Sequence, residues 1–167
     1  MKYAILMLAG VLLAQNSDPP AAAARGKKLF FEEGPKCATC HLAEGKGRKV
    51  GPDLKRLAML HPRALKMAIL SNGTEYVVVA KLKTGESFPA MRVEQNADTL
   101  KLWDLSKPEP EMKTLKPADL DSYGANSTWK HPPTSAGLSM QQLADIMSYI
   151  RFAAEGDRKG VSAEDIE

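Results

Sequence analysis

The sequence predicts a mainly α fold with an antiparallel β-meander inserted between its helices. Apolar residues recur at helical spacing in three segments, residues 21–31, 57–70 and 139–154. Between the second and the third, short runs of alternating apolar and polar residues are separated by turn residues, which is typical of strands. The chain has 167 residues, of which 44% are apolar, so we expect one domain with one core.

The helical segments carry stripes of apolar residues and recognisable ends. Pro62 fits the first turn of the second helix, with His61 just before it. Ser139 is a plausible N-cap for the third, and Gly156 follows its end. The residues expected to face the core are Gly26, Leu29 and Phe30 in the first helix, Leu65, Ala68 and Ile69 in the second, and Leu143, Ile146, Met147, Ile150 and Ala154 in the third. We expect Met59 and Met67 to be core residues as well.

The middle of the chain predicts three strands, at residues 76–83, 88–94 and 99–105. Thr84-Gly85-Glu86 and Asn96-Ala97-Asp98 supply the turns between them. A segment rich in proline and charge, residues 106–118, then predicts irregular structure. We therefore treat residues 76–118 as a β insertion with a proline-rich segment, inside a single domain over 21–154.

The N-terminus has the pattern of a secretory signal peptide. Lys2 precedes the apolar run 3–14, and the polar residues and prolines of 15–20 end it. A bilayer span needs about 20 apolar residues, so an uncleaved anchor is the weaker alternative. We expect residues 1–20 to be a signal peptide and leader. The mature protein is then periplasmic or secreted, in a bacterium, with no transmembrane segment.

The charge balance excludes some partners. The formal net charge is +3, and Lys and Arg are spread along the chain without a dense block. This predicts no binding to nucleic acid and none to an anionic membrane surface. The charged residues 155–167 predict a mobile tail.

The pattern that carries the chemistry is Cys37-Ala38-Thr39-Cys40-His41. C-x-x-C-H is the attachment signature of haem c. Two thiols at this spacing can form thioether bonds with the two vinyl groups of one porphyrin, and the adjacent histidine then becomes the proximal iron ligand. The sequence predicts one covalently bound haem c, and the export signal supports it because this haem is attached after export.

Three other interpretations of the two cysteines are weaker. A redox C-x-x-C motif belongs in a thioredoxin-like βαβ pattern, which is missing from this sequence. A structural zinc site needs four ligands, and Cys40 and His41 are adjacent, which suits tetrahedral geometry poorly. A disulfide across two residues is strained and leaves His41 unexplained.

These motifs together resemble class I cytochrome c. The family opens with a helix of the form G-x-x-L-F, here Gly26 to Phe30, continues with C-x-x-C-H, and then has a G-P-x-L turn, here Gly51 to Leu54. The resemblance implies a cytochrome c-like helical fold around one haem. It implies that Pro52 orients His41 by accepting its Nδ1 proton. It also implies that the first and last helices cross, a small residue such as Gly26 meeting an aromatic such as Tyr149.

The β insertion departs from small cytochromes. It resembles haem-binding c-type domains of large bacterial proteins, in which a β-meander lies between the haem motif and the last helix. In such domains a Met-Pro pair in the loop before the last helix supplies the sixth ligand. Here the corresponding loop has His131-Pro132, seven residues before Leu138, and no methionine.

We therefore expect His131 to be the distal ligand, with Met91 as its main rival and a surface histidine as the plain alternative. Met112 and Met140 are weaker rivals, and an open or water-ligated iron is the remaining alternative. Two histidines would give a lower reduction potential than a methionine and a histidine.

The predicted function is electron transfer between redox partner proteins by a mono-haem cytochrome, not an enzyme. One alternative is a non-catalytic haem subunit or docking module of a larger oxidoreductase complex, joined through the β insertion. Another is a haem-based gas sensor, which requires a displaceable distal ligand. A third alternative is a structural domain in which the haem is incidental.

Overall fold

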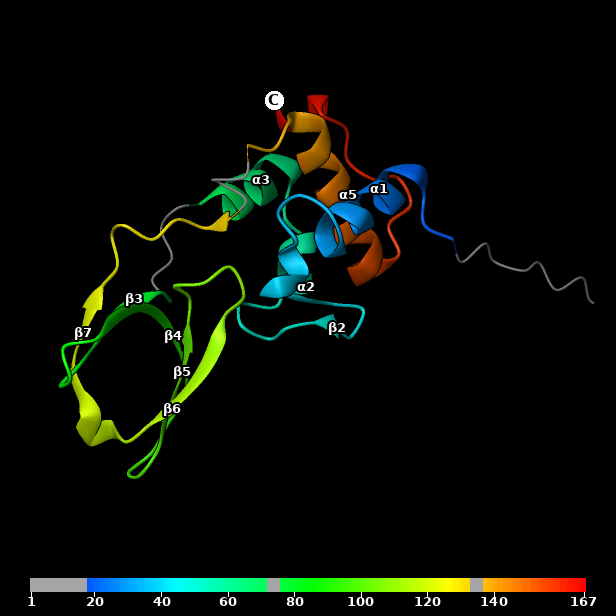
Figure 1. Ribbon diagram of the computed structural model, residues 1–167. Helices are drawn as coiled ribbons and strands as arrows, with labels where there is room; N and C mark the ends of the chain where they lie inside the picture. Colours follow the sequence, from blue (N-terminus) through cyan, green and yellow to red (C-terminus); the bar gives the residue numbers. More distant parts are fainter. Residues whose placement is uncertain (1–17, 72–75, 133–136) are drawn as a thin grey trace, which may run out of the picture.

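The computed structural model describes residues 18–71, 76–132 and 137–167. The helices gather in one unit that contains both the N-terminal and the C-terminal parts of the described chain, and a curled sheet lies to one side of it (Figure 1). Residues 1–17, which hold most of the predicted signal peptide, lie outside the described residues. Within the described ranges, no helix has both the length and the apolar character that crossing a bilayer demands.

The prediction of a mainly α fold was wrong. The structure holds 35% helix and 24% strand, with five strands in one sheet, so the fold combines helices and sheet in comparable amounts. The three predicted strands are present as β3 (Val78–Leu82), β4 (Ser87–Gln95) and β5 (Leu100–Asp104). Two further strands, β6 (Glu111–Leu115) and β7 (Leu120–Ala125), enlarge the expected meander.

The five strands are antiparallel and ordered β6-β5-β4-β3-β7. The last strand therefore returns across the sheet to pair with β3. The short 3-10 helix η2 (Pro117–Asp119) makes that turn. Register shifts at Lys81/Leu82 and at Arg92/Glu94 mark irregularities that increase the bend of the strands. The concave shape of the sheet in Figure 1 follows from them.

The sheet has its own small core, separate from that of the helices. Its buried side chains alternate along β3, β4 and β5 and share one face: Ala80, Leu82, Phe88, Ala90, Leu100 and Leu102. On the opposite face, Met91, Trp103 and Met112 are cross-strand neighbours in the ladder. One face of the sheet thus forms a small apolar core, and the other face carries a row of two methionines and one tryptophan.

The core of the helical unit is the crossing of α1 (Ala21–Phe31) and α5 (Met140–Glu155). A Cβ atom on Gly26 would lie 1.8 Å from the carbonyl oxygen of Asp145, so only glycine permits this approach. Gly26 therefore meets the backbone of α5 at Asp145 and Ile146. Tyr149 packs against Phe30, edge to face, with ring centroids 5.3 Å apart.

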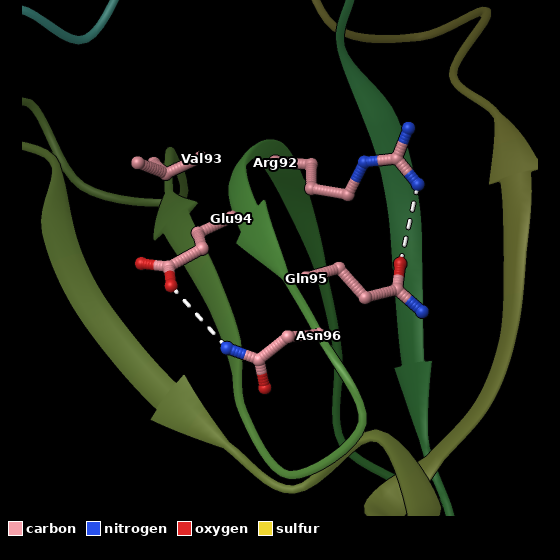
Figure 2. Close-up of a pocket in the computed structure, with 5 residues that line it drawn as sticks. All are labelled: Arg92, Val93, Glu94, Gln95 and Asn96. Carbon is pink, nitrogen blue, oxygen red and sulfur yellow. Dashed lines mark hydrogen bonds between the residues drawn. The ribbon is translucent and has the colours of Figure 1, made fainter.

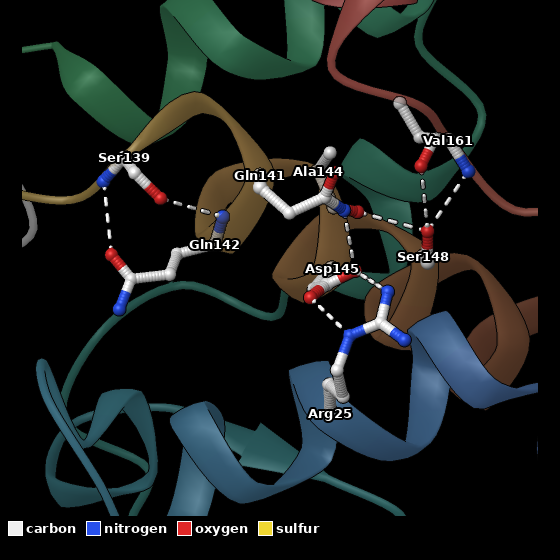
Figure 3. A network of polar contacts seen from close by, with 8 residues as sticks. All are labelled: Arg25, Ser139, Gln141, Gln142, Ala144, Asp145, Ser148 and Val161. Atoms are coloured by element: carbon white, nitrogen blue, oxygen red, sulfur yellow. Dashed lines mark hydrogen bonds and ion pairs between the residues drawn. The ribbon is translucent and has the colours of Figure 1, made fainter.

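A polar cluster ties the same crossing together (Figure 3). The Nε and Nη2 atoms of Arg25 each donate to the Asp145 carboxylate at 2.7 Å, and Gln141 donates to it at 3.0 Å. Asp145 is only 3% exposed, so its charge is neutralised by a bidentate partner from α1. This pairing fixes the register in which the two helices cross.

The ends of α5 are those predicted. The Ser139 side chain accepts from the Gln142 backbone at 3.2 Å, and the Gln142 side chain accepts from the Ser139 backbone at 3.0 Å, which completes a capping box. Gly156 ends the helix with φ of 70°, a left-handed conformation that favours glycine. These two signals set the length of the helix.

The predicted helix over 57–70 is two helices, α2 (Lys55–Ala58) and α3 (Pro62–Leu70). Pro62 cannot extend a preceding helix, because it lacks the backbone N–H, and it occupies the first position of α3 instead. His61 is the N-cap, as expected, and its Nδ1 accepts from the Arg63 backbone at 3.4 Å. Leu65 and Ile69 are buried as predicted.

The segment after α5 differs from the mobile tail that the sequence predicts. Val161 and Ile166 are 5% and 0% exposed and belong to the helical core. The buried Ser148 hydroxyl accepts from the Val161 backbone N–H at 2.8 Å. Lys66 on α3 donates to the carbonyl of Ile166, the last residue of the 3-10 helix η3 (Glu164–Ile166), at 2.6 Å. The chain end thus packs beside α3 and α5.

Candidate haem site

The two cysteines lie on one tight turn. Cys37 begins the 3-10 helix η1 (Cys37–Thr39), and its carbonyl accepts from the backbone N–H of Cys40 at 3.0 Å and of His41 at 2.8 Å. Lys36 enters the turn with φ of 45°. The turn therefore gathers both thiols and the imidazole of the C-x-x-C-H pattern within a single loop, as attachment of one haem requires.

Both thiols are free and half-buried. Burial raises the pKa of Cys37 to about 12. Burial also raises the pKa of Cys40, and the charge of Arg48 works in the opposite direction. A redox-active C-x-x-C motif needs a thiol with a lowered pKa, so these directions disfavour the thioredoxin-like interpretation. Two protonated, unpaired thiols are what addition to two vinyl groups needs.

A small hairpin behind the motif holds the loop in place. It consists of β1 (Leu42–Ala43) and β2 (Lys46–Gly47). The carbonyl of Cys40 accepts from the backbone of Val50 at 2.9 Å and of Gly51 at 2.8 Å. The chain from the motif to Pro52 is therefore one hydrogen-bonded unit.

His41 is fixed by that unit. The ring is 8% exposed, and its Nδ1 lies 2.8 Å from the carbonyl oxygen of Pro52, which accepts the Nδ1 proton. This contact places Pro52 where the family resemblance put it. A Cβ atom on Gly51 would lie 2.5 Å from His41 Cε1, so the ring rests directly on the Gly51 backbone. Burial lowers the pKa of His41, which keeps the imidazole neutral and its Nε2 free to bind a metal.

His131 is held in the same way by a different element. Its Nδ1 lies 3.0 Å from the carbonyl oxygen of Ile69. Ile69 is in the last turn of α3, where helix carbonyls have no partner within the helix. Burial lowers the pKa of His131, and His41 acts in the same direction. His131 is therefore a second neutral imidazole with Nδ1 engaged and Nε2 available.

The rings of His41 and His131 lie next to each other. Their ring centroids are 6.0 Å apart, and the ring planes are inclined by 72°. A metal–imidazole bond is about 2 Å long and a ring centre lies about 1 Å beyond its ligating nitrogen, so one iron between two rings needs about 6 Å. The separation of the rings would allow His41 and His131 to hold one haem iron between them.

Trp103 adds an observation that the sequence could not supply. Its Nε1 is buried and has no hydrogen-bond partner among the described residues. The Arg48 guanidinium lies 4.9 Å from the centre of its ring, and Arg48 donates its backbone N–H to Ala38 in the haem motif at 3.0 Å. A buried N–H without an acceptor is unfavourable. A haem carboxylate would provide the acceptor and would neutralise Arg48, so these residues fit the group.

Nothing in the sequence singled out Trp103 or Arg48. Trp103 reads as one aromatic residue in an alternating strand, and Arg48 as one cation in a loop rich in glycine and lysine. Only the fold shows that the inserted sheet brings Trp103 against the haem loop.

The methionines fall in other places. Met91 is on β4, opposite Trp103 in the strand ladder. Met147 is buried in α5, as expected. Met59 and Met67 are 79% and 73% exposed, so the prediction that they are core residues was wrong. Met59 directly follows α2, and Met67 is in α3.

A cluster of metal-ligating residues or a surface hollow would be the other candidates for a metal or haem site. Within the described ranges, no group of three or more His, Cys, Asp or Glu residues is arranged to bind a metal ion, which disfavours a zinc site. A wide hollow of about 570 Å³ lies at the end of β4 and is lined by residues 92–96 (Figure 2). Its side chains pair with one another, Arg92 with Gln95 and Asn96 with Glu94, and it contains no predicted haem ligand.

Comparison with known families agrees with this geometry. The sequence model described as Cytochrome c matches residues 23–122. The chain belongs to the cytochrome c family. It is thus a haem-binding electron-transfer protein. The matched segment contains Cys37, Cys40, His41 and Pro52, and it ends before His131. A search of curated proteins finds no match.

Proposed function

We propose that this cytochrome carries one haem, bound covalently through Cys37 and Cys40 and ligated by His41 and His131, and that it transfers single electrons between redox partners outside the cytoplasm. It acts as a carrier and not as an enzyme. Three separate segments contribute to the proposed site: the C-x-x-C-H loop, the end of α3 and the loop before α5. Their proximity is the structural basis of the proposal.

The observation that carries it is the opposed pair of imidazoles. Each ring presents Nε2 as a ligand because its Nδ1 proton is given to a backbone carbonyl, Pro52 for His41 and Ile69 for His131. Such outer hydrogen bonds fix the tautomer and raise the basicity of a ligating histidine. If His131 were only a surface histidine, which is the plain alternative, nothing would require its Nδ1 to be bonded to the Ile69 carbonyl beside a second imidazole.

The haem, when bound, supplies an iron that cycles between the ferric and ferrous states. The protein's part is to hold His41 and His131 in place, so that the same two side chains would ligate the iron in both oxidation states. The two carbonyls hold the Nδ1 protons, so neither histidine needs to change its protonation when the charge on the iron changes. A site with two fixed strong ligands suits electron transfer better than the binding of a gas.

The proposed location rests on the sequence of residues 1–20 and on the haem itself. Covalent attachment prevents loss of the cofactor in a dilute compartment, and the pattern of a signal peptide fits export. We propose that the mature protein is periplasmic or secreted.

Expression with haem maturation machinery, followed by intact-mass measurement, tests the proposal. The mature chain is expected to gain the mass of one haem that survives acidic organic extraction, and the Cys37→Ser and Cys40→Ser variants to lose covalent attachment at one or both bonds. A potentiometric titration is expected to show one one-electron wave. A chain without covalent haem, or a reduced protein that binds carbon monoxide readily at an open position, would contradict it.

A further inference from the structure

The two ligand rings of the proposed site are far from parallel. Their planes are inclined by 72°, and each plane is set by contacts outside the haem space. On the proximal side, the Pro52 carbonyl and the Gly51 backbone leave His41 little freedom to rotate. The relative orientation therefore depends on what fixes His131.

Trp129 is the side chain that packs on His131. The two rings are edge to face, with centroids 6.2 Å apart and planes inclined by 61°. Together with the Ile69 carbonyl on Nδ1, this contact restrains the ring from two directions. Rotation of His131 about its Cβ–Cγ bond would move the ring into Trp129 and lengthen the hydrogen bond.

Trp129 is itself held by a local turn directly after β7. The Asn126 carboxamide oxygen accepts from the Trp129 backbone at 2.8 Å and from the Thr128 backbone at 3.1 Å. Asparagine commonly stabilises such turns by bonding to the backbone that follows it. The turn thus sets the position of Trp129, and Pro132 restricts the backbone of His131 from the other side.

We infer that Trp129 is a positioning residue for the distal ligand and that it holds the His131 ring close to perpendicular to His41. The inference rests on the proposed bis-histidine site and deepens it. Imidazole planes interact with two iron d orbitals that lie at right angles to each other. Perpendicular rings leave these orbitals nearly equal in energy, whereas parallel rings split them and stabilise the ferric state.

Perpendicular ligands have two measurable consequences. The ferric protein shows a strongly anisotropic low-spin electron paramagnetic resonance signal with one dominant low-field feature, not the three-line rhombic signal of parallel rings. Its reduction potential is also higher than that of the same two ligands in parallel planes. Trp129 therefore tunes the potential without touching the iron.

The test compares ferric spectra and potentials of wild-type holoprotein with those of Trp129→Leu and Trp129→Phe. Wild type is expected to give the anisotropic signal. Trp129→Leu is expected to remain low-spin, to shift toward the rhombic signal and to have a lower potential, and Trp129→Phe to restore much of the wild-type behaviour because an aromatic edge is kept. Tyr76→Leu, at an aromatic residue that is 67% exposed, is the control and should match wild type.

The outcomes separate this inference from the proposed function. A rhombic bis-histidine signal in wild type, or an unchanged signal in Trp129→Leu, overturns the inference and leaves the two ligands in place. A sulfur-to-iron band in wild type overturns the ligand assignment itself. If Trp129→Leu becomes high-spin while wild type is anisotropic, Trp129 keeps His131 on the iron and does not set the plane of its ring, which overturns the inference.

Discussion

The rings of His41 and His131 have centroids 6.0 Å apart and planes inclined by 72°, although the whole inserted sheet separates the two residues in the sequence. Each ring gives its Nδ1 proton to a backbone carbonyl, so the two residues are equivalent in their hydrogen bonding and differ only in the element that supports them.

The contact between Gly51 and His41 predicts that Gly51→Ala disturbs the proximal ligand. The added methyl group would lie 2.5 Å from His41 Cε1, so the ring or the Pro52 segment must move. We expect the holoprotein to lose about 1–3 kcal/mol of unfolding free energy. We also expect its potential to rise, because a weaker Nδ1 hydrogen bond makes the ligand less basic. Denaturant titration and voltammetry measure the two effects.

Gly124→Ala is the matched control for that variant. Gly124 is in β7, and a Cβ atom there would meet nothing within 4 Å. Its unfolding free energy should stay within about 0.5 kcal/mol of wild type. Equal losses in both variants would show that the His41 contact is not the cause.

The unpartnered Trp103 N–H predicts a distinctive magnetic resonance signal. The chain has two tryptophans, so the holoprotein should show two indole N–H peaks, and Trp103→Phe should remove one and thereby assign it. We expect the Trp103 peak to exchange slowly with solvent and to shift between the oxidised and reduced states, since it is buried next to the haem loop. Fast exchange with no dependence on redox state would show that the sheet does not reach the haem.

Glu44 predicts part of the acid sensitivity of the fold. The hydrogen bond from Lys27 Nζ, at 2.7 Å, is the main cause that lowers the pKa of Glu44 from its ordinary 4.5, and the Tyr149 hydroxyl also donates to Glu44 at 3.1 Å. A lowered folded-state pKa adds stability that is fully present above the unfolded value and is lost as the pH falls through the folded value. Thermal midpoints of wild type and Glu44→Gln should therefore differ at pH about 6 and converge toward pH about 3. Parallel curves would contradict this linkage.

The buried chain end predicts that the last residues matter for stability. Ile166→Ala should cost about 2–5 kcal/mol, because Ile166 is fully buried and its removal leaves a cavity. A matched pair sharpens the test: Val161→Ala, at a residue 5% exposed, should cost clearly more than Val93→Ala, at a residue 51% exposed. Chemical denaturation of the four proteins gives the comparison. No loss in either buried variant would restore the interpretation of this segment as a tail.

The sequence was informative where local signals are strong. Ser139 and Gly156 bracket α5 because a side-chain cap and a left-handed glycine act through neighbouring residues alone. The C-x-x-C-H pattern is equally local. His131 was selected only through the family resemblance, and its contact with Ile69 shows how a residue far away in the chain positions it.

The sequence was less informative where tertiary packing decides the structure. β6 lies between proline-rich segments, and β7 has no regular alternation of burial, so pairing with β5 and β3 decides their structure. Val161 and Ile166 are single apolar residues in a charged segment, without helical or strand spacing. Their burial depends on packing beside α3 and α5, to which hydrogen bonds from Lys66 and to Ser148 join this segment, and no periodicity in the sequence reveals that packing.

The near-infrared and visible spectra of the oxidised holoprotein, recorded for wild type beside His131→Ala, test the account most directly. It predicts a low-spin wild type without the sulfur-to-iron band and a His131→Ala variant that loses the low-spin state, while Met91→Leu leaves the spectrum unchanged. A sulfur-to-iron band in wild type, or a His131→Ala variant that stays low-spin, would contradict the assignment of His131 as the second iron ligand.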